Sequence, residues 1–435
     1  MKAVNVGIVG LGTVGSGTAR VLRDNAAEIS RRLGRAVRVS VVCSRSEEKA
    51  REIAPDAVFV TNPFDLVGRE DVDIVVELFG GTDIAKDIVL QALENGKHVV
   101  TANKKLLAEY GNEVFALAER KNVMVNFEAA VAGGIPIIKA LREGLAANNI
   151  RSIAGIINGT SNFILSEMRE KGSPFAEVLK QAQELGYAEA DPTFDIEGHD
   201  AGHKITIMSS LAFGTPVNFR ACYLEGISKL DSRDIKYAEE LGYRIKLLGI
   251  TRKTEKGIEL RVHPTLIPEC RLIANVNGVM NAVRVQADMV GETLYYGPGA
   301  GSLPTASAVV ADIVDICRLM GAEAESRVPY LAFQAGQVKE LTILPMDEIT
   351  SSYYLRVRAE DKPGVLGQIA NLLAEQAVSI EALIQKGVLD GNHAEIVILT
   401  HSTVEKQIKA AIGEIEAMSA VQGGVVMIRM ESLHG

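Results

Sequence analysis

The chain has 435 residues, of which 47% are hydrophobic and 23% are charged, as in ordinary soluble globular proteins. This length predicts about two to four domains, each large enough to bury its own core. The aromatic fraction of 5%, without tryptophan, argues against a protein that stacks single-stranded nucleic acid, and the net charge of −9 argues against a broad polyanion-binding surface. We therefore expect no nucleic-acid partner, although a local basic pocket stays open.

The spacing of the cysteines is typical of a protein in a reducing compartment, and the apolar segments are too short to span a membrane. The four cysteines are far apart and fit neither a zinc motif nor a disulfide framework. The first residues lead into a strand-like segment without the features of a signal peptide, and no apolar stretch approaches the ~18 residues that span a bilayer. We expect a cytoplasmic protein with no membrane partner.

The first 135 residues alternate between strand-like and helical segments. Apolar runs suited to strands occupy residues 4–9, 37–43, 74–76, 98–101 and 123–127. Helical spacing of apolar residues covers 14–33, 84–94 and 106–120. Such alternation predicts a parallel sheet. We therefore assign residues 1–135 to a Rossmann-like, doubly wound α/β domain, which a helix within about residues 305–325 completes.

The pattern changes after residue 135. Residues 136–304 mix helical stretches with longer strand-like runs, which predicts a central α+β domain. Its expected helices are 136–147, 163–169, 175–185 and 198–211, and its expected strands are 150–157, 245–251, 258–265 and 282–290. Residues 326–350 have no firm pattern and are predicted to be a linker. Residues 351–435 follow a βαββαβ order, which predicts a ferredoxin-like module.

A glycine-rich segment joins the first strand to the first helix. Its sequence, Gly10-Leu11-Gly12-Thr13-Val14-Gly15, lets the backbone turn tightly and approach a pyrophosphate, while the helix N-terminus offers amide donors and the positive end of its dipole. This context favours a dinucleotide site over a glycine-rich turn without a ligand.

The end of the second strand reads Cys43-Ser44-Arg45-Ser46. NAD-binding domains usually carry a carboxylate there for the ribose hydroxyls, and a carboxylate would repel a 2′-phosphate. Arg45 with neighbouring hydroxyls would bind that phosphate instead. We infer a preference for NADP(H), with NAD(H) still usable; a solvated loop arginine is the alternative.

Two further polar segments follow strands of the first domain. They are Gly80-Gly81-Thr82 and the segment 101–105, and both should face the carboxyl edge of the sheet, where doubly wound folds bind ligands. Lys104 could hold a phosphate or polarise a carbonyl near the nicotinamide. It could equally be a surface charge at the start of a helix.

The densest polar cluster spans residues 184–204. Asp200 and Lys204 are four residues apart, so a helix would bring them to one face beside apolar neighbours. Partial desolvation would lower the pKa of Lys204 toward that of a general acid or base, and Asp200 would hold the lysine in place. Nearby Glu189, Asp191 and Asp195 favour this active-site interpretation over an i,i+4 ion pair at the surface.

His199 and His203 have the spacing of zinc ligands. Asp200 occupies the place of the glutamate in an H-E-x-x-H motif, but no third ligand stands out and Gly202 weakens the helix. We therefore expect no zinc site.

Six segments together resemble homoserine dehydrogenases that carry a C-terminal ACT domain. They are GLGTVG at 10–15, VVTANK at 99–104, FEAAVAGGIPI at 127–137, GIINGTSNFI at 155–164, GYAEADPTFDIEGHDAGHK at 186–204 and YGPGAGSLPTA at 296–306. The resemblance implies NAD(P)-dependent interconversion of L-aspartate 4-semialdehyde and L-homoserine, in the biosynthesis of threonine, methionine and isoleucine.

The resemblance also implies roles for individual residues. Lys204 would donate and accept the proton of the substrate oxygen, with Lys104 and Asp200 as further catalytic residues. The substrate-binding positions are Gly186, Glu189, Asp195 and Asp200. The cofactor-binding positions are Gly10, Gly12, Thr13, Val14, Gly15, Arg45, Thr82, Lys104, Gly186 and Gly301. A monovalent cation, Na⁺ or K⁺, would be held at Glu128, Val131, Gly133 and Ile135, chiefly by backbone oxygens.

The resemblance further implies regulation and assembly. The segment 361–366 is similar to the ligand-binding loop of ACT modules, which implies threonine as an effector; a module used only for dimerisation is the alternative. The central domain would form a homodimer and ACT pairing a homotetramer.

Other activities are less consistent with the residues. An aspartate-semialdehyde dehydrogenase needs a nucleophilic cysteine, and Cys222, Cys270 and Cys317 have no obvious activating neighbour in sequence. The acidic cluster and the ACT module disfavour a sugar dehydrogenase. A non-catalytic amino-acid sensor would not need both Asp200 and Lys204.

Overall fold

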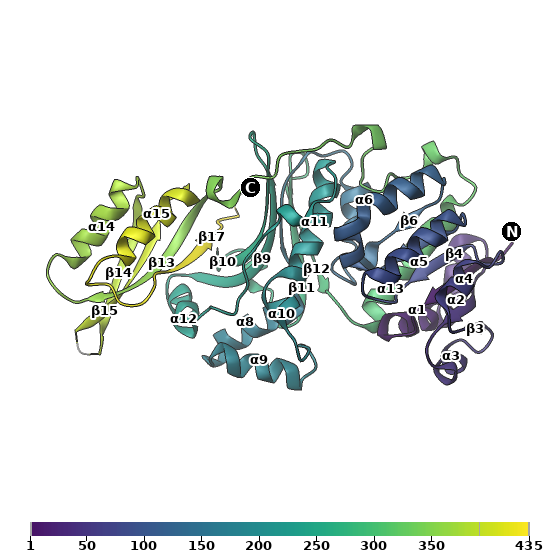
Figure 1. The fold of residues 1–435 in the computed structure, drawn as a ribbon, viewed down its shortest axis with the longest axis horizontal. Helices are drawn as coiled ribbons and strands as arrows, with labels where there is room; N and C mark the ends of the chain where they lie inside the picture. Colours follow the sequence, from purple (N-terminus) through teal and green to yellow (C-terminus); the bar gives the residue numbers. More distant parts are fainter. Residues whose placement is uncertain (1, 391, 434–435) are drawn as a thin grey trace. The chain divides into compact units, whose positions relative to one another are not determined.

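The computed structural model describes residues 2–390 and 392–433, and its backbone separates into two compact units (Figure 1). Unit 1 consists of residues 2–159, Asp200–Cys222 and Val279–Leu341. Unit 2 consists of Thr160–His199, Tyr223–Gly278 and residues 342–433. The three predicted domain ranges stay predictions, because each unit contains several separate segments of the chain.

The first part of unit 1 is a six-stranded parallel sheet in the order β3-β2-β1-β4-β5-β6. Its strands are β1 (Val4–Val9), β2 (Val37–Cys43), β3 (Val58–Val60), β4 (Ile74–Glu77), β5 (His98–Thr101) and β6 (Val125–Asn126). Its helices are α1 (Thr13–Asp24), α2 (Ala26–Leu33), α3 (Glu47–Ile53), α4 (Pro63–Val67), α5 (Asp83–Glu94) and α6 (Lys104–Arg120). This is the strand order of a dinucleotide-binding Rossmann domain, so the predicted doubly wound fold is confirmed.

Two details of this sheet differ from the sequence prediction. The predicted helix over 14–33 is two helices, because Asn25 adopts φ −103° and ψ 15° between them, and asparagine is a poor residue for a helix interior. The short strand β3 and helices α3 and α4 were not predicted. Their segments are too short and too exposed for a strong periodic pattern.

A late helix closes the core of this sheet. Helix α13 (Ser302–Leu319) packs on α1, and its residues Val309, Ile313 and Ile316 are buried with Val6 and Ile8 of β1. The N-terminal sheet therefore obtains part of its hydrophobic core from residues about 300 positions further along the chain.

The rest of unit 1 contains a second, antiparallel set of strands. Strand β11 (Met280–Ala287) pairs with β7 (Ile150–Ile156) on one side and with β12 (Glu292–Pro298) on the other. The predicted strand 282–290 thus begins two residues late and ends three residues late, and β12 was not predicted. The predicted helix 136–147 is only α7 (Ile137–Lys139) followed by a π-helical turn at Ala140–Gly144. Helix α11 (His199–Phe213) is buried along most of its length.

Unit 2 combines helices with a long mixed sheet. Its first helices are α8 (Gly159–Lys171), α9 (Phe175–Glu184), α10 (Thr193–Ile196) and α12 (Ser232–Glu240). Its first strands are β8 (Tyr223–Leu224), β9 (Tyr243–Lys253) and β10 (Ile258–Pro268). Strands β9 and β10 form an antiparallel pair over their full length.

The C-terminal module belongs to the same sheet. It comprises β13 (Thr350–Glu360), α14 (Val365–Glu375), β14 (Ile380–Asp390), β15 (His393–Thr400), β16 (Thr403–Val404), α15 (Glu405–Glu416) and β17 (Val426–Met430). Its strand order, β17-β13-β15-β14, with α14 and α15 in one core with the strands, confirms the ferredoxin-like prediction. Strand β17 also pairs with β10 in parallel at Thr265 and Leu266, so the module extends the sheet of β9 and β10.

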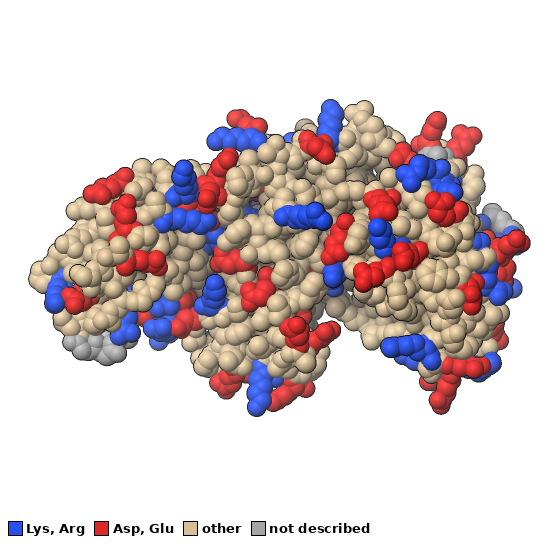
Figure 2. All heavy atoms as spheres, viewed as in Figure 1, with Lys and Arg blue, Asp and Glu red and all other residues tan. Residues whose placement is uncertain are grey.

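The surface carries charges of both signs. Figure 2 shows acidic and basic side chains interspersed over the face in view. None of the helices described is both long and apolar enough to cross a bilayer.

Candidate active site

The glycine-rich loop between β1 and α1 is built for close approach of a ligand to the backbone. Gly10 has φ +97°, and a Cβ at Gly15 would lie 1.9 Å from the carbonyl oxygen of Gly10. A Cβ at Gly12 would meet nothing within 4 Å, so this face of the loop is open. The first turn of α1 begins there with Thr13 and Val14, and its amide groups suit an anionic pyrophosphate.

Gly301 lies beside this loop although it is remote in sequence. It precedes α13 with φ +126°, and the next residue, Ser302, donates a hydrogen bond from Oγ to the carbonyl oxygen of Thr13 at 2.8 Å. A Cβ at Gly17 would lie 2.7 Å from Ser302 Oγ. The structure therefore brings the predicted cofactor positions Gly301 and Thr13 together.

The predicted specificity residue Arg45 follows β2 at the carboxyl edge of the sheet. Its side chain is exposed, and Ser46 caps α3 by accepting a hydrogen bond from the amide of Lys49 at 3.2 Å. The position suits a 2′-phosphate, but it equally suits a solvated arginine. Thr82 precedes the first residue of α5 and follows Gly80 and Gly81, which both have positive φ.

Lys104, Asp200 and Lys204 form one cluster of charges in unit 1. Asp200 Oδ1 lies 2.9 Å from Lys104 Nζ, and Asp200 Oδ2 lies 2.7 Å from Lys204 Nζ. Lys204 also donates to the carbonyl oxygen of Ile157 at 2.6 Å, and Asn158 Nδ2 donates to Asp200 Oδ2 at 2.8 Å. The cluster has two ammonium groups for one carboxylate, and so a formal charge of +1.

Burial distinguishes this cluster from a surface ion pair. The side chains of Asp200 and Lys204 are 3% and 9% exposed, whereas that of Lys104 is 35% exposed. Burial by itself would raise the pKa of Asp200, but the charges of Lys104 and Lys204 hold that pKa well below its usual range. The surface-pair alternative is therefore wrong for Asp200 and Lys204, and Lys104 forms the side of the cluster that is open to solvent.

Three predicted substrate residues lie in unit 2, in the segment between α9 and α10. Gly186 has φ +75°, Glu189 is exposed, and Asp195 lies in α10 with its carbonyl oxygen accepting from Ser161 Oγ at 3.0 Å. Thr160 Oγ1 donates to the carbonyl oxygen of Tyr187 at 2.6 Å. The start of α8 therefore anchors this segment at two points.

The predicted cation segment forms a tight loop after β6. Ala132 and Gly133 have φ +54° and +50°, and a Cβ at Gly133 would lie 2.4 Å from the carbonyl oxygen of Gly299. Glu128 accepts hydrogen bonds from the amides of Ile138 and Lys139, each at 2.8 Å. Burial raises the pKa of Glu128 to about 7.

Two carbonyl oxygens in this loop suit a cation. Val131 and Gly133 are buried, and within residues 2–390 and 392–433 no hydrogen bond to their carbonyl oxygens is formed. The carbonyl oxygen of Glu128 accepts a long bond from the Val131 amide at 3.3 Å, and that of Ile135 accepts from the Ile137 amide at 2.8 Å. Buried carbonyl oxygens of this kind are the hard ligands that alkali ions prefer, so the loop fits such an ion.

The surroundings of His203 and of two cysteines bear on the alternatives of a zinc site and a cysteine nucleophile. His203 packs edge-on against the ring of Phe219, with centroids 4.2 Å apart, and the described part of the chain holds no group of three or more His, Cys, Asp or Glu side chains suited to a metal. Burial raises the pKa of Cys222 to about 12 and that of Cys317 to about 11. Such thiols are protonated at neutral pH, which argues against a cysteine nucleophile.

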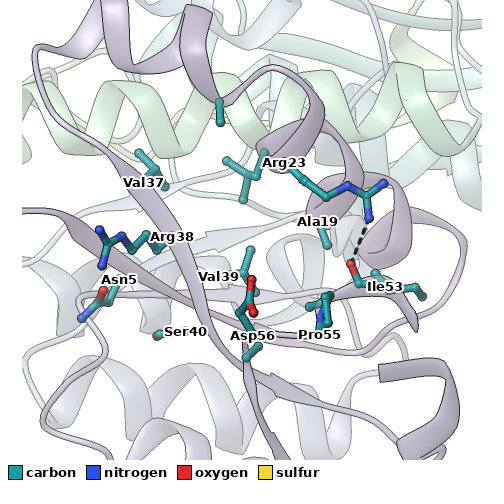
Figure 3. Close-up of a pocket in the computed structure, with 14 residues that line it drawn as sticks. Asn5, Ala19, Arg23, Val37, Arg38, Val39, Ser40, Ile53, Pro55 and Asp56 are labelled. Carbon is teal, nitrogen blue, oxygen red and sulfur yellow. Dashed lines mark hydrogen bonds between the residues drawn. The ribbon is translucent and has the colours of Figure 1, made fainter. Parts of the chain in front are cut away.

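A cavity of about 600 Å³ lies elsewhere in unit 1 (Figure 3). It is lined by the beginning of β2, including Val37 and Val39, and by Arg23, which reaches the carbonyl oxygen of Ile53 at 3.4 Å. None of the predicted cofactor or substrate residues lines it. It is therefore distinct from the site at the carboxyl edge.

Sequence reasoning missed several partners of the site. Ile157 contributes a backbone carbonyl, which leaves no residue signature, and Asn158 was considered only as part of the segment 155–164 that resembles the family. Glu77 at the end of β4 is buried and accepts hydrogen bonds from the following loop. A charged residue that ends an otherwise apolar strand was the available signal for Glu77.

Comparison with known proteins covers nearly the whole chain. Family profiles match residues 10–128 ("Homoserine dehydrogenase, NAD binding domain"), 136–314 ("Homoserine dehydrogenase") and 353–419 ("ACT domain"). A homoserine dehydrogenase of Neisseria gonorrhoeae is 79% identical over 434 residues, covering 100% of both chains.

Solved structures of homoserine dehydrogenases are also similar to this chain. A homoserine dehydrogenase from Thiobacillus denitrificans superimposes with a TM-score of 0.95 at 62% identity, covering 100% of this chain and 99% of that one. A hyperthermophilic archaeal homoserine dehydrogenase in complex with NADPH has a TM-score of 0.62 at 30% identity and covers 72% of this chain and 98% of that one.

Proposed function

This chain belongs to the homoserine dehydrogenase family and is an NAD(P)-dependent oxidoreductase, and on that premise we propose that Lys204, Lys104 and Asp200 carry out its proton chemistry. The reaction is the reversible reduction of L-aspartate 4-semialdehyde to L-homoserine. The observation that carries the proposal is the buried Lys104–Asp200–Lys204 cluster, in which one carboxylate orients two ammonium groups at 2.9 and 2.7 Å.

The mechanism follows from the charges of the cluster. When bound, the nicotinamide supplies the hydride that adds to the carbonyl carbon of the semialdehyde. Negative charge then develops on the carbonyl oxygen, and Lys204 donates a proton to that oxygen, so that the carbonyl becomes a hydroxyl. Lys104 stabilises the developing charge from the open side of the cluster. In the oxidative direction, neutral Lys204 takes the hydroxyl proton back.

Asp200 keeps both lysines in a productive geometry. Its low pKa keeps it ionised through the physiological range, so it neutralises one of the two ammonium charges at every working pH. Its hydrogen bonds also restrict the rotamers of two long side chains, which lowers the entropic cost of reaching the transition state. The substrate's amino-acid portion would be bound by Glu189 and Asp195 together with Asp200, and Gly186 would let the backbone approach it.

The cofactor would lie along the carboxyl edge of the Rossmann sheet. Its pyrophosphate would be held at Gly10, Gly12, Thr13, Val14 and Gly15, with Thr82, Lys104, Gly186 and Gly301 toward the nicotinamide half. We infer a preference for NADP(H), because Arg45 takes the place of the usual carboxylate after β2. A relative in complex with NADPH supports this choice of cofactor.

A monovalent cation, Na⁺ or K⁺, would be held by the loop from Glu128 to Ile135. The proposal is supported by the buried carbonyl oxygens of Val131 and Gly133. The ion would fix the conformation of this loop beside Gly299, which precedes Ala300 and Gly301. Its contribution is therefore to the shape of the site.

Regulation and assembly complete the proposal. Threonine would bind the ACT module at the loop 361–366 and lower activity, as feedback on threonine, methionine and isoleucine biosynthesis requires. The enzyme would be a cytoplasmic homodimer through the central region, with a tetramer through ACT pairing as the larger assembly.

A spectrophotometric assay tests the proposed function. Purified enzyme is given L-homoserine with NADP⁺ or NAD⁺, with and without threonine and with Na⁺, K⁺ or neither. We expect reduction of NADP⁺ at a higher kcat/KM than of NAD⁺, inhibition by threonine, and loss of that inhibition in Asp361→Ala. Absence of turnover with L-homoserine and either cofactor would contradict the proposed activity.

A further inference from the structure

Glu77, the last residue of β4, is a fully buried side chain in unit 1 that lies outside the cluster of Lys104, Asp200 and Lys204. Its relative exposure is 0%. Its Oε1 accepts hydrogen bonds from the backbone amides of Phe79 at 2.9 Å and Gly80 at 3.4 Å. Its Oε2 accepts from the hydroxyl of Thr101, the last residue of the neighbouring strand β5, at 2.7 Å. One side chain therefore joins the ends of two adjacent parallel strands.

The hydrogen bonds continue from Thr101 to the beginning of α6. The amide of Asn103 donates to Thr101 Oγ1 at 3.0 Å, and Asn103 Oδ1 accepts from the amide of Leu106 at 3.1 Å, which caps the helix. Asn103 Nδ2 donates to the carbonyl oxygen of Gly81 at 2.7 Å, and Gly81 lies in the loop between β4 and α5, the first of the two loops. The result is a closed set of bonds between the loop after β4 and the loop after β5.

Each loop carries a residue of the proposed site. The first loop leads through Gly80 and Gly81 to Thr82, which precedes α5. The second leads to Lys104, the first residue of α6, whose ammonium group lies 2.9 Å from Asp200. Gly80 and Gly81, with φ +80° and +73°, have no side chains that could pack, so the part of this loop next to Thr82 is held by the bonds of the Gly80 amide to Glu77 and of the Gly81 carbonyl oxygen to Asn103.

We propose that Glu77 is a positioning residue that keeps the loops of Thr82 and Lys104 in one register, so that the cofactor side and the proton-transfer side of the reaction stay aligned. The proposal deepens the proposed function and rests on the assignment of Lys104 to it. Glu77 acts through the backbone amides of Phe79 and Gly80 and through Thr101.

The chemistry of the residue agrees with this role. Burial raises the pKa of Glu77, while hydrogen bonds from Thr101, Phe79, Gly80 and Asn103 lower it. A carboxylate is the side chain that can accept bonds on both oxygens at once, from donors on two strands. An apolar side chain at the end of β4 could accept none of these bonds, and the residues that precede Glu77 in β4 (Ile74, Val75 and Val76) are all apolar.

The test is a double-mutant cycle between Glu77 and Lys104. The variants are Glu77→Gln, Lys104→Met and their combination, measured for kcat, for KM of L-homoserine and for the Kd of NADPH. If Glu77 acts by positioning Lys104, Glu77→Gln lowers kcat about 10-fold or more in the wild-type background and less than about 2-fold in the Lys104→Met background. Equal losses in the two backgrounds overturn the proposal, because a residue that only stabilises the fold does not depend on Lys104.

A second pair of variants covers the case in which Glu77→Gln does not fold. Thr101→Val removes the hydroxyl that bonds to Glu77 and to the Asn103 amide but keeps the shape, whereas Thr101→Ser keeps the hydroxyl. We expect Thr101→Val to lower kcat about 5-fold or more and Thr101→Ser to retain wild-type kcat. Equal kcat in both variants overturns the proposal. The proposed function itself is tested by wild-type turnover of L-homoserine, so its failure is distinguishable from loss of the positioning effect.

Discussion

Two groups of buried charges in this protein are built from the same kinds of interaction but from different basic residues. Unit 1 contains Lys104, Asp200 and Lys204, with two lysines for one carboxylate. Unit 2 contains networks of arginines with glutamates and aspartates, in which Arg429 contacts Glu405 and Glu225, each at 2.6 Å. The lysine cluster has an excess of positive charge and an open side, whereas Arg429 is 1% exposed and surrounded by carboxylates.

The arginine networks connect the C-terminal module to the rest of unit 2. Arg261 of β10 binds Glu431, which follows β17, at 2.6 Å. Arg356 of β13 binds Asp234 of α12 at 2.6 Å and Glu395 of β15 at 3.1 Å. A guanidinium group keeps its proton throughout the physiological range and binds carboxylates with two nitrogens at once, which suits a fixed connection.

The difference between the lysine cluster and the arginine networks indicates which of them can transfer a proton. A lysine ammonium group can pass its proton to a substrate oxygen and take it back, whereas a guanidinium group keeps its proton throughout the physiological range. We therefore expect changes in the lysine cluster to alter turnover with little effect on stability, and changes in the arginine networks to alter stability with little effect on turnover.

Lys204→Met carries the largest expected effect. Removal of the proton donor should lower kcat by about 10³-fold, which corresponds to about 4 kcal/mol of transition-state stabilisation. The Kd of NADPH, measured by fluorescence titration, should stay within about 3-fold of the wild-type value. A kcat near that of the wild type would show that Lys204 is not the proton donor.

Arg429→Met tests whether the arginine networks of unit 2 stabilise the fold without affecting turnover. It leaves the fully buried Glu405 without its main partner, which should destabilise the fold by about 3 kcal/mol and lower the thermal unfolding midpoint, while kcat at low temperature stays within about 2-fold of wild type. The matched control is the double variant Arg429→Met/Glu405→Leu, in which both charges are absent and much of the stability should return. A double variant as unstable as the single one would contradict this explanation.

A pH effect on stability is expected from His98, in unit 1. Its Nδ1 accepts a hydrogen bond from the amide of Met124 at 2.9 Å, and burial, with the nearby charge of Arg327, lowers its pKa to about 4. Between pH 6.5 and about 4 the unfolded chain binds a proton that the folded chain does not, so stability is present above pH 6.5 and falls as the pH decreases through this range.

The expected loss for His98 is about 2 kcal/mol between about pH 7.5 and pH 5. His98→Gln, which can still accept the bond from Met124 but does not titrate, is the control. Its unfolding midpoint in urea should decrease less over the same pH range than that of the wild type. Identical pH dependence in both proteins would rule out His98 as the source.

Arg45→Ala should have the smallest effect of these substitutions. Loss of the proposed 2′-phosphate contact should lower kcat/KM for NADPH about 10-fold and leave kcat/KM for NADH nearly unchanged. Arg51 is the matched control, because it is an exposed arginine of the adjacent helix α3 and pairs with Glu47 at 2.6 Å. If the ratio of kcat/KM for NADPH to kcat/KM for NADH is the same in Arg45→Ala, Arg51→Ala and the wild type, Arg45 has no role in cofactor specificity.

Much of the fold could be predicted from the sequence, because its strands and helices follow clear apolar patterns. The strands at 37–43 and 98–101 have the predicted bounds, and the glycine motif identifies the start of α1. Strand β12 could not be predicted in the same way, since it lies at an edge of the sheet and its residues other than Gly297 are half-buried or exposed, so it has no clear apolar pattern. Its partner β11 supplies the information that its own sequence lacks.

The candidate site was predictable to the extent that side chains carry it. The i,i+4 spacing of Asp200 and Lys204 on one helix indicated their contact. The contact of Lys104 with Asp200 joins residues almost one hundred positions apart and depends on the tertiary fold. Backbone carbonyl oxygens, such as those of Ile157 and Val131, have no sequence signal at all. The contact of Glu77 with Thr101 could not be predicted either, because it depends on the pairing of β4 with β5.

The measurement that tests the central claim most directly is the kcat of Lys204→Arg with L-homoserine and NADP⁺. This variant keeps a positive charge that can pair with Asp200, but it replaces a group that can transfer a proton with a guanidinium group that keeps its proton throughout the physiological range. If Lys204 is the proton donor and acceptor, Lys204→Arg should be folded, bind NADPH and have a kcat as low as that of Lys204→Met. A kcat within about 10-fold of the wild type would mean that Lys204 acts only as a fixed charge, as the arginines of unit 2 do.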